Sequence, residues 1–178
     1  MSDPKIPINL KAVRTRAGLS LSQAAELTGI SKAMLGQIER GESSPTIATM
    51  WKLTKGFHLP LTAFLTDWQD TTVPRTPVRF PGSITVAPVF PFDPLVGSET
   101  FLVTLDPGQE HVSHPHDAGV VEDVVVTLGT VEVLRDGNWA PCARNDGLRF
   151  AADQPHGYRN PSDAPAQFLN VLHYPQLP

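Results

Sequence analysis

Proline is distributed unevenly along this chain, and that distribution limits the folds open to it. Only four of the 18 prolines lie in residues 1–66, whereas the short segment TTVPRTPVRFPG at residues 71–82 carries three. Proline fixes φ and removes a backbone donor, so this segment predicts a semi-rigid, extended linker. Apolar residues recur with helical spacing before it and alternate with polar ones after it. We therefore expect two domains, residues 1–66 and 83–178, joined by a linker at residues 67–82.

The charge is divided in the same way. Residues 1–66 hold eight Lys and Arg against four Asp and Glu, and residues 67–178 hold six against fourteen. A basic domain joined to an acidic one suggests that the first can approach a polyanion, although this modest excess alone does not establish nucleic-acid binding. The only cysteine, Cys142, excludes an intrachain disulfide. With no secretory leader and no bilayer-length apolar run, we expect a soluble cytoplasmic protein without a membrane partner.

Helix signals follow one another through residues 1–66. The sequence SLSQ at residues 20–23 is a capping box, in which Ser20 and Gln23 satisfy each other's end amides, and Gly29 ends that helix. Ser31 can cap the next helix, which ends at Gly41. The pattern predicts five short helices with these apolar stripes: Leu10, Val13 and Ala17; Ala24, Ala25 and Leu27; Leu35 and Ile38; Ile47, Met50, Trp51 and Leu53; and Leu61, Phe64 and Leu65.

Two of these helices, joined by the tight turn TGIS, have the pattern of a DNA-binding helix-turn-helix. Gln37 can make two hydrogen bonds to adenine, Lys32 can reach guanine or phosphate, and Ala33 can contact a thymine methyl. The residues expected to face DNA are Ser31, Lys32, Ala33, Met34, Gln37 and Arg40 for the major groove, and Ser20, Ser22 and Gln23 for phosphate. Taken one at a time, such capped helices are as well explained as parts of any small helical bundle.

After the linker, short apolar runs such as FLVTL, VVVTL, VEVLR and QFLNVLHY alternate with Gly, Pro and Asn-Asp breaks. Many short strands with closely spaced turns predict an all-β sandwich or small barrel. The sequences DG at residues 136–137 and NDG at residues 145–147 are typical hairpin turns.

Three histidines and one glutamate in this region suggest a metal site. Side chains two residues apart on a strand share a face, so His114 and His116 can converge, with His156 and Glu122 supplied by other strands. Such a set suits Zn²⁺, Mn²⁺, Fe²⁺ or Ni²⁺. Taken alone, a His-x-His sequence is more often part of a surface loop, and a glutamate that opens a strand is more often an edge charge.

Other polar residues of this region have less definite roles. Asp123 is expected on the face opposite Glu122, and His111 and His173 are not assigned as ligands. Arg149 could pair with a ligand carboxylate, and Tyr158 shares a strand face with His156. An exposed charge and a core aromatic residue are equally good readings of these two.

The longer motifs resemble known families. The sequence GLSLSQAAELTGISKAMLGQIERGESSPTIATMWKLTKGF resembles the Cro/CI-type helix-turn-helix of the XRE family over residues 8–66. Gly108, His114-Pro115-His116, Glu122 and Gly129 resemble the first cupin motif, and Gly147 through Pro155, His156 and Asn160 resemble the second. Together they look like the XRE–cupin regulators, close to the sulfur-utilisation regulator group.

That resemblance implies a lambda-repressor-like helical bundle followed by a cupin barrel, that is, a jelly roll or double-stranded β-helix. It also implies that His114, His116, Glu122 and His156 occupy the four metal-ligand positions. Five residues separate His116 from Glu122, which is longer than the usual motif.

Three functions follow as hypotheses. The first is a regulator that binds an operator in double-stranded DNA and whose cupin domain senses a small-molecule effector or a divalent metal, without enzymatic activity. The second is a cupin metalloenzyme, dioxygenase- or isomerase-like, tethered to a DNA-binding domain. The third is a DNA-binding protein whose barrel pocket is empty. Because paired half-sites require paired recognition helices, we also expect a homodimer held mainly through residues 80–178.

Overall fold

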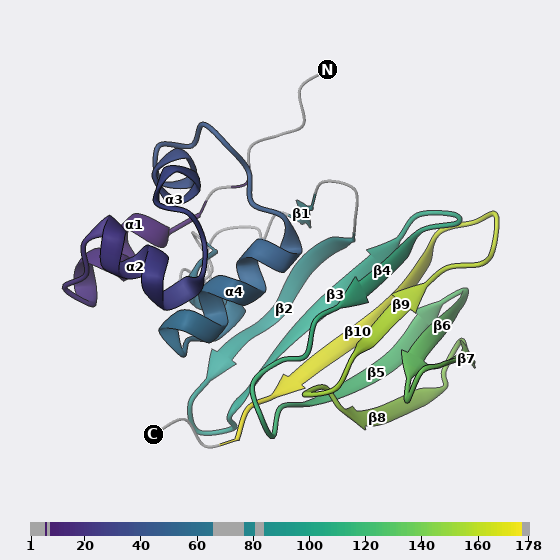
Figure 1. Ribbon diagram of the computed structural model, residues 1–178. Helices are drawn as coiled ribbons and strands as arrows, with labels where there is room; N and C mark the ends of the chain where they lie inside the picture. Colours follow the sequence, from purple (N-terminus) through teal and green to yellow (C-terminus); the bar gives the residue numbers. More distant parts are fainter. Residues whose placement is uncertain (1–5, 7, 66–76, 81–83, 176–178) are drawn as a thin grey trace. The chain divides into compact units, whose positions relative to one another are not determined.

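The computed structural model describes residues 6, 8–65, 77–80 and 84–175, and the chain divides into two compact units, Met1–Pro74 and Arg75–Pro178. The first is helical and the second is built of strands (Figure 1). Most of the predicted linker, residues 67–82, lies outside the described residues. Within it, Val78–Arg79 form a short strand that pairs with Thr85 and Val86, so these two residues belong to the sheet of the second unit.

The described residues of the helical unit form four α-helices, where the sequence predicted five. They are α1 (Leu10–Arg16), α2 (Leu21–Thr28), α3 (Lys32–Glu39) and α4 (Ile47–Phe57). The segment predicted as a fifth helix forms only the 3-10 turn η1 (Leu61–Ala63). Its backbone turns to another partner: Phe64 accepts a hydrogen bond from the Asn9 amide at 2.7 Å, and Leu65 forms a β-bridge with Ile8. Those bonds take the place of a continued helical ladder.

Local signals in the sequence set the helix boundaries. The Ser20 hydroxyl accepts from the Gln23 amide at 3.3 Å, and the Gln23 side chain accepts from the Ser20 amide at 2.9 Å, which confirms the capping box. The Ser31 hydroxyl caps α3 by accepting a hydrogen bond from the Met34 amide at 3.2 Å. Gly29 ends α2 with a φ of 65°, a left-handed conformation that favours glycine.

The helices pack around a small apolar core, and one ion pair joins two of them. Leu10, Leu35, Met50, Leu53 and Phe64 are fully buried. Arg14 of α1 binds both carboxylate oxygens of Glu39 at the end of α3, at 2.6 and 2.9 Å, and also donates to the Leu19 carbonyl. This two-pronged contact fixes the end of α3 against α1. Leu27, which was predicted in the buried stripe of α2, is instead 47% exposed, and Thr28 is buried in its place.

The second unit is a pair of antiparallel sheets. Its strands are β1 (Val78–Arg79), β2 (Thr85–Asp93), β3 (Ser98–Leu105), β4 (Glu110–Ser113), β5 (Val121–Leu128), β6 (Thr130–Arg135), β7 (Asn138–Ala143), β8 (Gly147–Ala151), β9 (His156–Arg159) and β10 (Ala166–His173). One sheet has the order β1-β2-β3-β10-β5-β8 and the other has β4-β9-β6-β7 (Figure 1). The arrangement agrees with the predicted two-sheet β fold.

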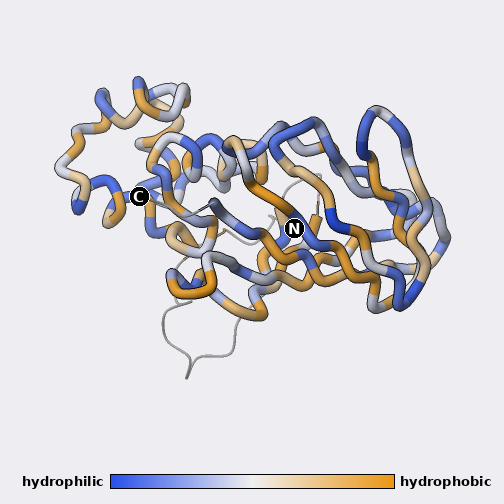
Figure 2. Tube along the Cα trace, turned by 90° about the horizontal axis from the view of Figure 1, so that it is seen from below, coloured by the Kyte–Doolittle hydropathy of each residue, from blue (hydrophilic) through white to orange (hydrophobic). Residues whose placement is uncertain are grey.

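Alternation of buried and less buried residues shows which face of each strand points inward. Along β3 and β10 every second residue is buried, and Figure 2 shows apolar and polar residues alternating along the strands. The predicted hairpin turn at residues 136–137 is confirmed, since it joins the paired strands β6 and β7 and Asp136 adopts a φ of 52°. The predicted hairpin at residues 145–147 is wrong, because that turn, with a φ of 73° at Asn145, joins β7 to β8, which lie in different sheets. Several buried positions are polar rather than apolar: Glu99, His111, Ser113, Glu122, His156, Asn160 and Asn170. A core that buries so many polar groups requires partners for them.

Candidate metal centre and DNA-binding face

Two of these buried polar residues, Glu122 and His156, converge with the partly buried His116 inside the second unit. His116 lies in the loop after β4, Glu122 on β5 and His156 at the start of β9, and one ligand atom from each lies within 4.8 Å of the others. Glu122 Oε1 is 2.7 Å from His116 Nε2 and 3.4 Å from His156 Nε2. Glu122 and His156 are each 1% exposed. Two imidazoles and a carboxylate are the donor set that divalent transition metals prefer.

The hydrogen bonds of His156 show whether such an ion would fit. Its Nδ1 lies 2.8 Å from the Gln154 carbonyl oxygen, which can only accept, so Nδ1 carries a proton. Its Nε2 is buried and has no hydrogen-bond partner among the described residues, because the contact to Glu122 lacks hydrogen-bond geometry. In the neutral ring this nitrogen therefore presents a bare lone pair towards the cluster. The residues present fit a divalent metal ion.

The two oxygens of the Glu122 carboxylate have different surroundings. Oε2 accepts hydrogen bonds from the Tyr158 hydroxyl and, at 2.8 Å, from the Asn170 amide. Oε1 faces the two imidazoles. Tyr158 and Asn170 thus fix the orientation of the carboxylate and leave one oxygen directed at the cluster. Outer hydrogen bonds of this kind orient metal ligands and raise their affinity.

The charges of the cluster are strongly coupled. Burial alone would raise the pKa of Glu122, but the imidazoles of His116 and His156 outweigh it and hold that pKa well below its usual value. Burial would lower the pKa of His156, and the Glu122 carboxylate prevails and raises it. Burial and the charge of Glu122 both raise the pKa of Tyr158 well above 10, which keeps its hydroxyl protonated and able to donate.

His114, predicted as a fourth ligand, is exposed and lies outside this group. The prediction assumed an extended strand through His114 and His116, but β4 ends at Ser113, so the two-residue alternation does not reach them. The segment is instead tied to the loop before β9: His116 donates its amide to the Ala152 carbonyl at 2.9 Å, and Ala152 donates to Val120 at 2.9 Å. These main-chain bonds bring His116 alone towards the cluster.

His111, which the sequence left unassigned, is buried on β4 close to the cluster. Its Nε2 lies 2.9 Å from the Ser113 hydroxyl, and burial together with the charge of His156 lowers its pKa to about 4. The strand pairs closely with β9, since a Cβ at Gly157 would lie 2.6 Å from the His111 carbonyl oxygen. No local pattern marks His111 as buried, because the apolar residue between His111 and Ser113, Val112, is 54% exposed.

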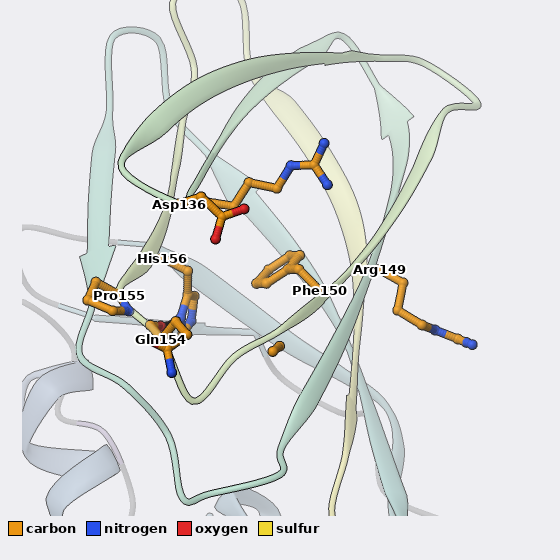
Figure 3. Close-up of a pocket in the computed structure, with 8 residues that line it drawn as sticks. Asp136, Arg149, Phe150, Gln154, Pro155 and His156 are labelled. Carbon is orange, nitrogen blue, oxygen red and sulfur yellow. Dashed lines mark hydrogen bonds between the residues drawn. The ribbon is translucent and has the colours of Figure 1, made fainter.

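The two predicted pocket residues, Tyr158 and Arg149, have different surroundings. Tyr158 faces inward and binds Glu122, as described above. Arg149 binds Asp123 through both guanidinium prongs, at 2.5 and 2.6 Å, and these bonds lower the pKa of Asp123. Asp123 also lies 3.0 Å from His173 Nε2, so it points away from Glu122, as predicted. The Arg149 side chain is mostly exposed and is directed away from the other residues of the pocket (Figure 3).

A pocket of about 290 Å³ reaches His156 from outside (Figure 3). Its walls come from the turn between β6 and β7, from β8 and from the loop before β9. The lining residues are Arg135, Asp136, Arg149, Phe150, Ala151, Gln154, Pro155 and His156. His156 of the candidate metal site is therefore part of a pocket wall that also carries charged groups.

The predicted DNA-binding residues form an exposed face on α3 and at the start of α2. Side chains of Lys32, Ala33 and Gln37 are exposed, and Met34 is 39% exposed. Arg40 is also exposed, but it binds Glu42 at 2.7 and 2.8 Å. Ser20, Ser22 and Gln23 lie together at the N-terminus of α2, where main-chain amides suit a phosphate. None of the helices in the described part of the chain is long and apolar enough for a membrane span.

Comparisons with known proteins agree with both halves. Residues 10–64 match the helix-turn-helix family and residues 101–172 match the cupin domain family. The HTH-type transcriptional regulator SutR of Escherichia coli (strain K12) is 42% identical over 167 residues, which cover 94% of this chain and 93% of SutR.

Two solved structures are similar to this one. A crystal structure of an HTH_3 family transcriptional regulator from Vibrio cholerae has 42% sequence identity and a TM-score of 0.80, and the match covers 93% of each chain. The cupin domain of an XRE family transcriptional regulator from Enterobacter cloacae has 43% identity and a TM-score of 0.51, over 52% of this chain and 98% of that one.

Proposed function

The chain belongs to the helix-turn-helix transcriptional regulators that carry a cupin domain, and from that premise we propose that its cupin domain is a sensor that controls operator binding. In this proposal a divalent metal and a small-molecule effector occupy the second unit, and their occupancy changes the affinity of the first unit for DNA in the cytoplasm. The observation that carries it is the bare, buried Nε2 of His156 beside Glu122 and His116. A buried acceptor without a partner is costly unless a ligand completes it.

His116, Glu122 and His156 would hold the ion, with Tyr158 and Asn170 orienting the carboxylate. When bound, the ion would supply open coordination positions to which an effector oxygen or nitrogen can attach. The exposed His114 contributes no ligand in this arrangement. Elemental analysis of the purified protein would identify the metal among Zn²⁺, Mn²⁺, Fe²⁺ and Ni²⁺.

The test measures metal and DNA binding on the same samples. Elemental analysis gives the metal content of the purified protein, and fluorescence anisotropy gives its affinity for DNA recovered by in vitro selection, before and after chelation. We expect His116→Ala and His156→Ala to lose the metal and to make DNA affinity insensitive to chelator. His114→Ala serves as the matched control and should behave like the native chain. Unchanged metal content in both cluster variants would contradict the proposal.

On the DNA side, we propose that α3 enters the major groove. Lys32, Ala33 and Gln37 are exposed on one helix and supply donors and a methyl group for base edges. The amides at the start of α2 bind phosphate, with Ser20, Ser22 and Gln23 around them. Arg40 can contact the DNA phosphate backbone only after its bond to Glu42 breaks, so we expect it to contribute less to DNA affinity.

We also propose a homodimer held mainly by the second unit. One helix-turn-helix reads few base pairs, and pairing places two recognition helices about 34 Å apart on successive major grooves. Light scattering at micromolar concentration on the full chain and on residues 71–178 tests this proposal. Both should have the mass of a dimer. A monomeric fragment beside a dimeric full chain would move the interface to the helices.

A second candidate function has one observation in its favour. Two histidines and one carboxylate form the ligand set of non-haem Fe²⁺ oxygenases, and His116, His156 and Glu122 match that set. Oxygen consumption by the Fe²⁺-loaded protein with candidate effectors separates the two functions. A sensor leaves the effector unchanged, whereas turnover that is lost in His156→Ala would identify an enzyme.

A further inference from the structure

The pocket beside His156 has a composition that points to a class of ligand. Small-molecule pockets span roughly 300–1,000 Å³, so a pocket of about 290 Å³ suits a single small metabolite. Phe150, Ala151 and Pro155 give it an apolar wall. His156 also lines the pocket, although its Nε2 itself is buried.

Two opposite charges belong to the lining of this pocket. Arg135 ends β6, and Asp136 occupies the following turn with a φ of 52°. Among the described residues, neither side chain forms an ion pair or a hydrogen bond, with the other or with any neighbour. Figure 3 shows the carboxylate of Asp136 turned towards Phe150 and His156. The lining thus offers one uncompensated cation and one uncompensated anion on consecutive residues.

The third charged residue of the lining does not alter this balance. Arg149 gives both prongs of its guanidinium to Asp123, and its side chain is directed away from the pocket (Figure 3). Its charge is already paired outside the cavity. A purely anionic ligand would face the carboxylate of Asp136, and a purely cationic ligand would face the guanidinium of Arg135.

A ligand with both charges on neighbouring atoms satisfies both groups. We propose, building on the sensor function above, that this pocket binds a free α-amino acid, with its carboxylate at Arg135 and its ammonium group at Asp136. The amino-acid side chain packs on Phe150 and Ala151. Hydrogen bonds between charged groups give this recognition its strength, and each of the two contacts can be removed separately.

The test uses calorimetry on the full-length protein loaded with Mn²⁺ and freed of excess metal. Each of the common L-amino acids is titrated first. Two analogues of the best binder are then titrated: its amide, which lacks the carboxylate charge, and its 2-oxo acid, which lacks the ammonium group. We expect the native chain to bind the amino acid at least about tenfold more tightly than either analogue.

The variants assign the two charges. Arg135→Gln should lose the preference over the amide and keep the preference over the oxo acid, and Asp136→Asn should do the opposite. Asparagine tolerates the left-handed conformation of this turn, so Asp136→Asn keeps the hairpin. Arg144→Gln, at an exposed turn residue that does not line the pocket, is the matched control and should bind as the native chain does. If no amino acid binds, or if both variants bind as the native chain does, the assignment is wrong.

These outcomes are separable from those of the sensor function. Retained metal binding and a chelator-sensitive DNA affinity, without amino-acid binding, would overturn only the ligand assignment. Amino-acid binding that leaves DNA affinity unchanged would support the assignment and count against sensing.

Discussion

The two units of this protein place their functional groups in opposite ways. In the helical unit the core is apolar and the residues proposed to contact DNA, such as Lys32 and Gln37, stand on the exposed face of one helix. In the barrel the candidate site is itself part of the interior, because Glu122 and His156 are buried among the packed strands. Residues proposed to contact DNA can therefore be replaced without disturbing the fold of the first unit. In the second unit the same buried contacts hold both the fold and the candidate site.

The contacts also differ in range along the chain. The caps of α2 and α3 join residues three apart. The bonds that orient Glu122 come from Tyr158 and Asn170, which are 36 and 48 residues away. A short-range signal can be read in a sequence, and a long-range one depends on the sheet order. The comparison therefore predicts where substitutions will affect only one unit and where they will affect fold and site together.

The largest effects should come from core truncations that act on one unit each. Leu35→Ala and Phe168→Ala both remove fully buried side chains and should each lower stability by about 3–5 kcal/mol. We expect Leu35→Ala to abolish DNA binding with normal metal content, and Phe168→Ala to lose metal. Leu27→Ala, at a half-exposed position, is the control for the first. Loss of metal in Leu35→Ala would break the separation between the units.

A slightly smaller effect should appear as a pH dependence of the barrel. The pKa of His111 is lowered from 6.5 to about 4, so the unfolded chain takes up a proton below pH 6.5 that the folded chain does not. The contribution of His111 to stability is therefore lost as pH falls from 6.5 towards 4, by on the order of 3 kcal/mol. The raised pKa of His156 acts in the opposite sense and offsets part of it.

Urea unfolding of the chelated protein at several pH values measures this loss. His111→Gln should unfold with a shallower dependence on pH between 6.5 and 4. The same slope in both proteins would remove His111 from the explanation.

The next effect tests the division of the Glu122 carboxylate. Tyr158→Phe removes one donor to Oε2 without changing the ring, and metal affinity should fall by about tenfold to a hundredfold. Tyr174→Phe is the matched control, because the Tyr174 hydroxyl also donates to a carboxylate, that of Glu99, outside the metal cluster. Competition with a chromogenic chelator gives both affinities. Equal losses in the two variants would show a general effect on the barrel rather than one on the ligand.

The smallest effect concerns the exposed face of α3. Gln37→Ala should weaken specific DNA binding by about 1–3 kcal/mol and leave non-specific binding unchanged, because it removes a contact proposed to reach a base edge. The fold should be unaffected, because the side chain is exposed and its loss leaves no cavity. Anisotropy with selected and random DNA measures both affinities. An equal loss on the two DNAs would place Gln37 at the phosphate backbone.

The success of sequence reasoning followed the range of the contacts. Ser20, Gly29 and Ser31 act on residues within a few positions, and their caps were predicted correctly. The fifth helix was wrong because Phe64 and Leu65 bond to residues 8 and 9, which no local pattern reveals. The prediction that Leu27 is buried was wrong, because the spacing of apolar residues along a helix does not show which of them its neighbours cover.

In the barrel the residue types of the site were visible and their geometry was not. His116, Glu122 and His156 were predicted together on motif spacing and do converge. His114 was expected beside them because two-residue alternation was extended beyond the end of β4. Asn170 was not predicted at all, since its place beside Glu122 depends on β10 lying between β3 and β5. Pairing of that kind is fixed by the assembled sheet.

The attachment of the His116 segment has a consequence for evolution. His116 and Val120 are tied to Ala152 through main-chain atoms, which every residue type supplies and which only proline lacks as a donor. Mutations at the exposed Ala118 therefore leave the histidine where it is. Relatives of this protein can therefore vary the exposed residues of this loop while His116 keeps its place beside Glu122 and His156.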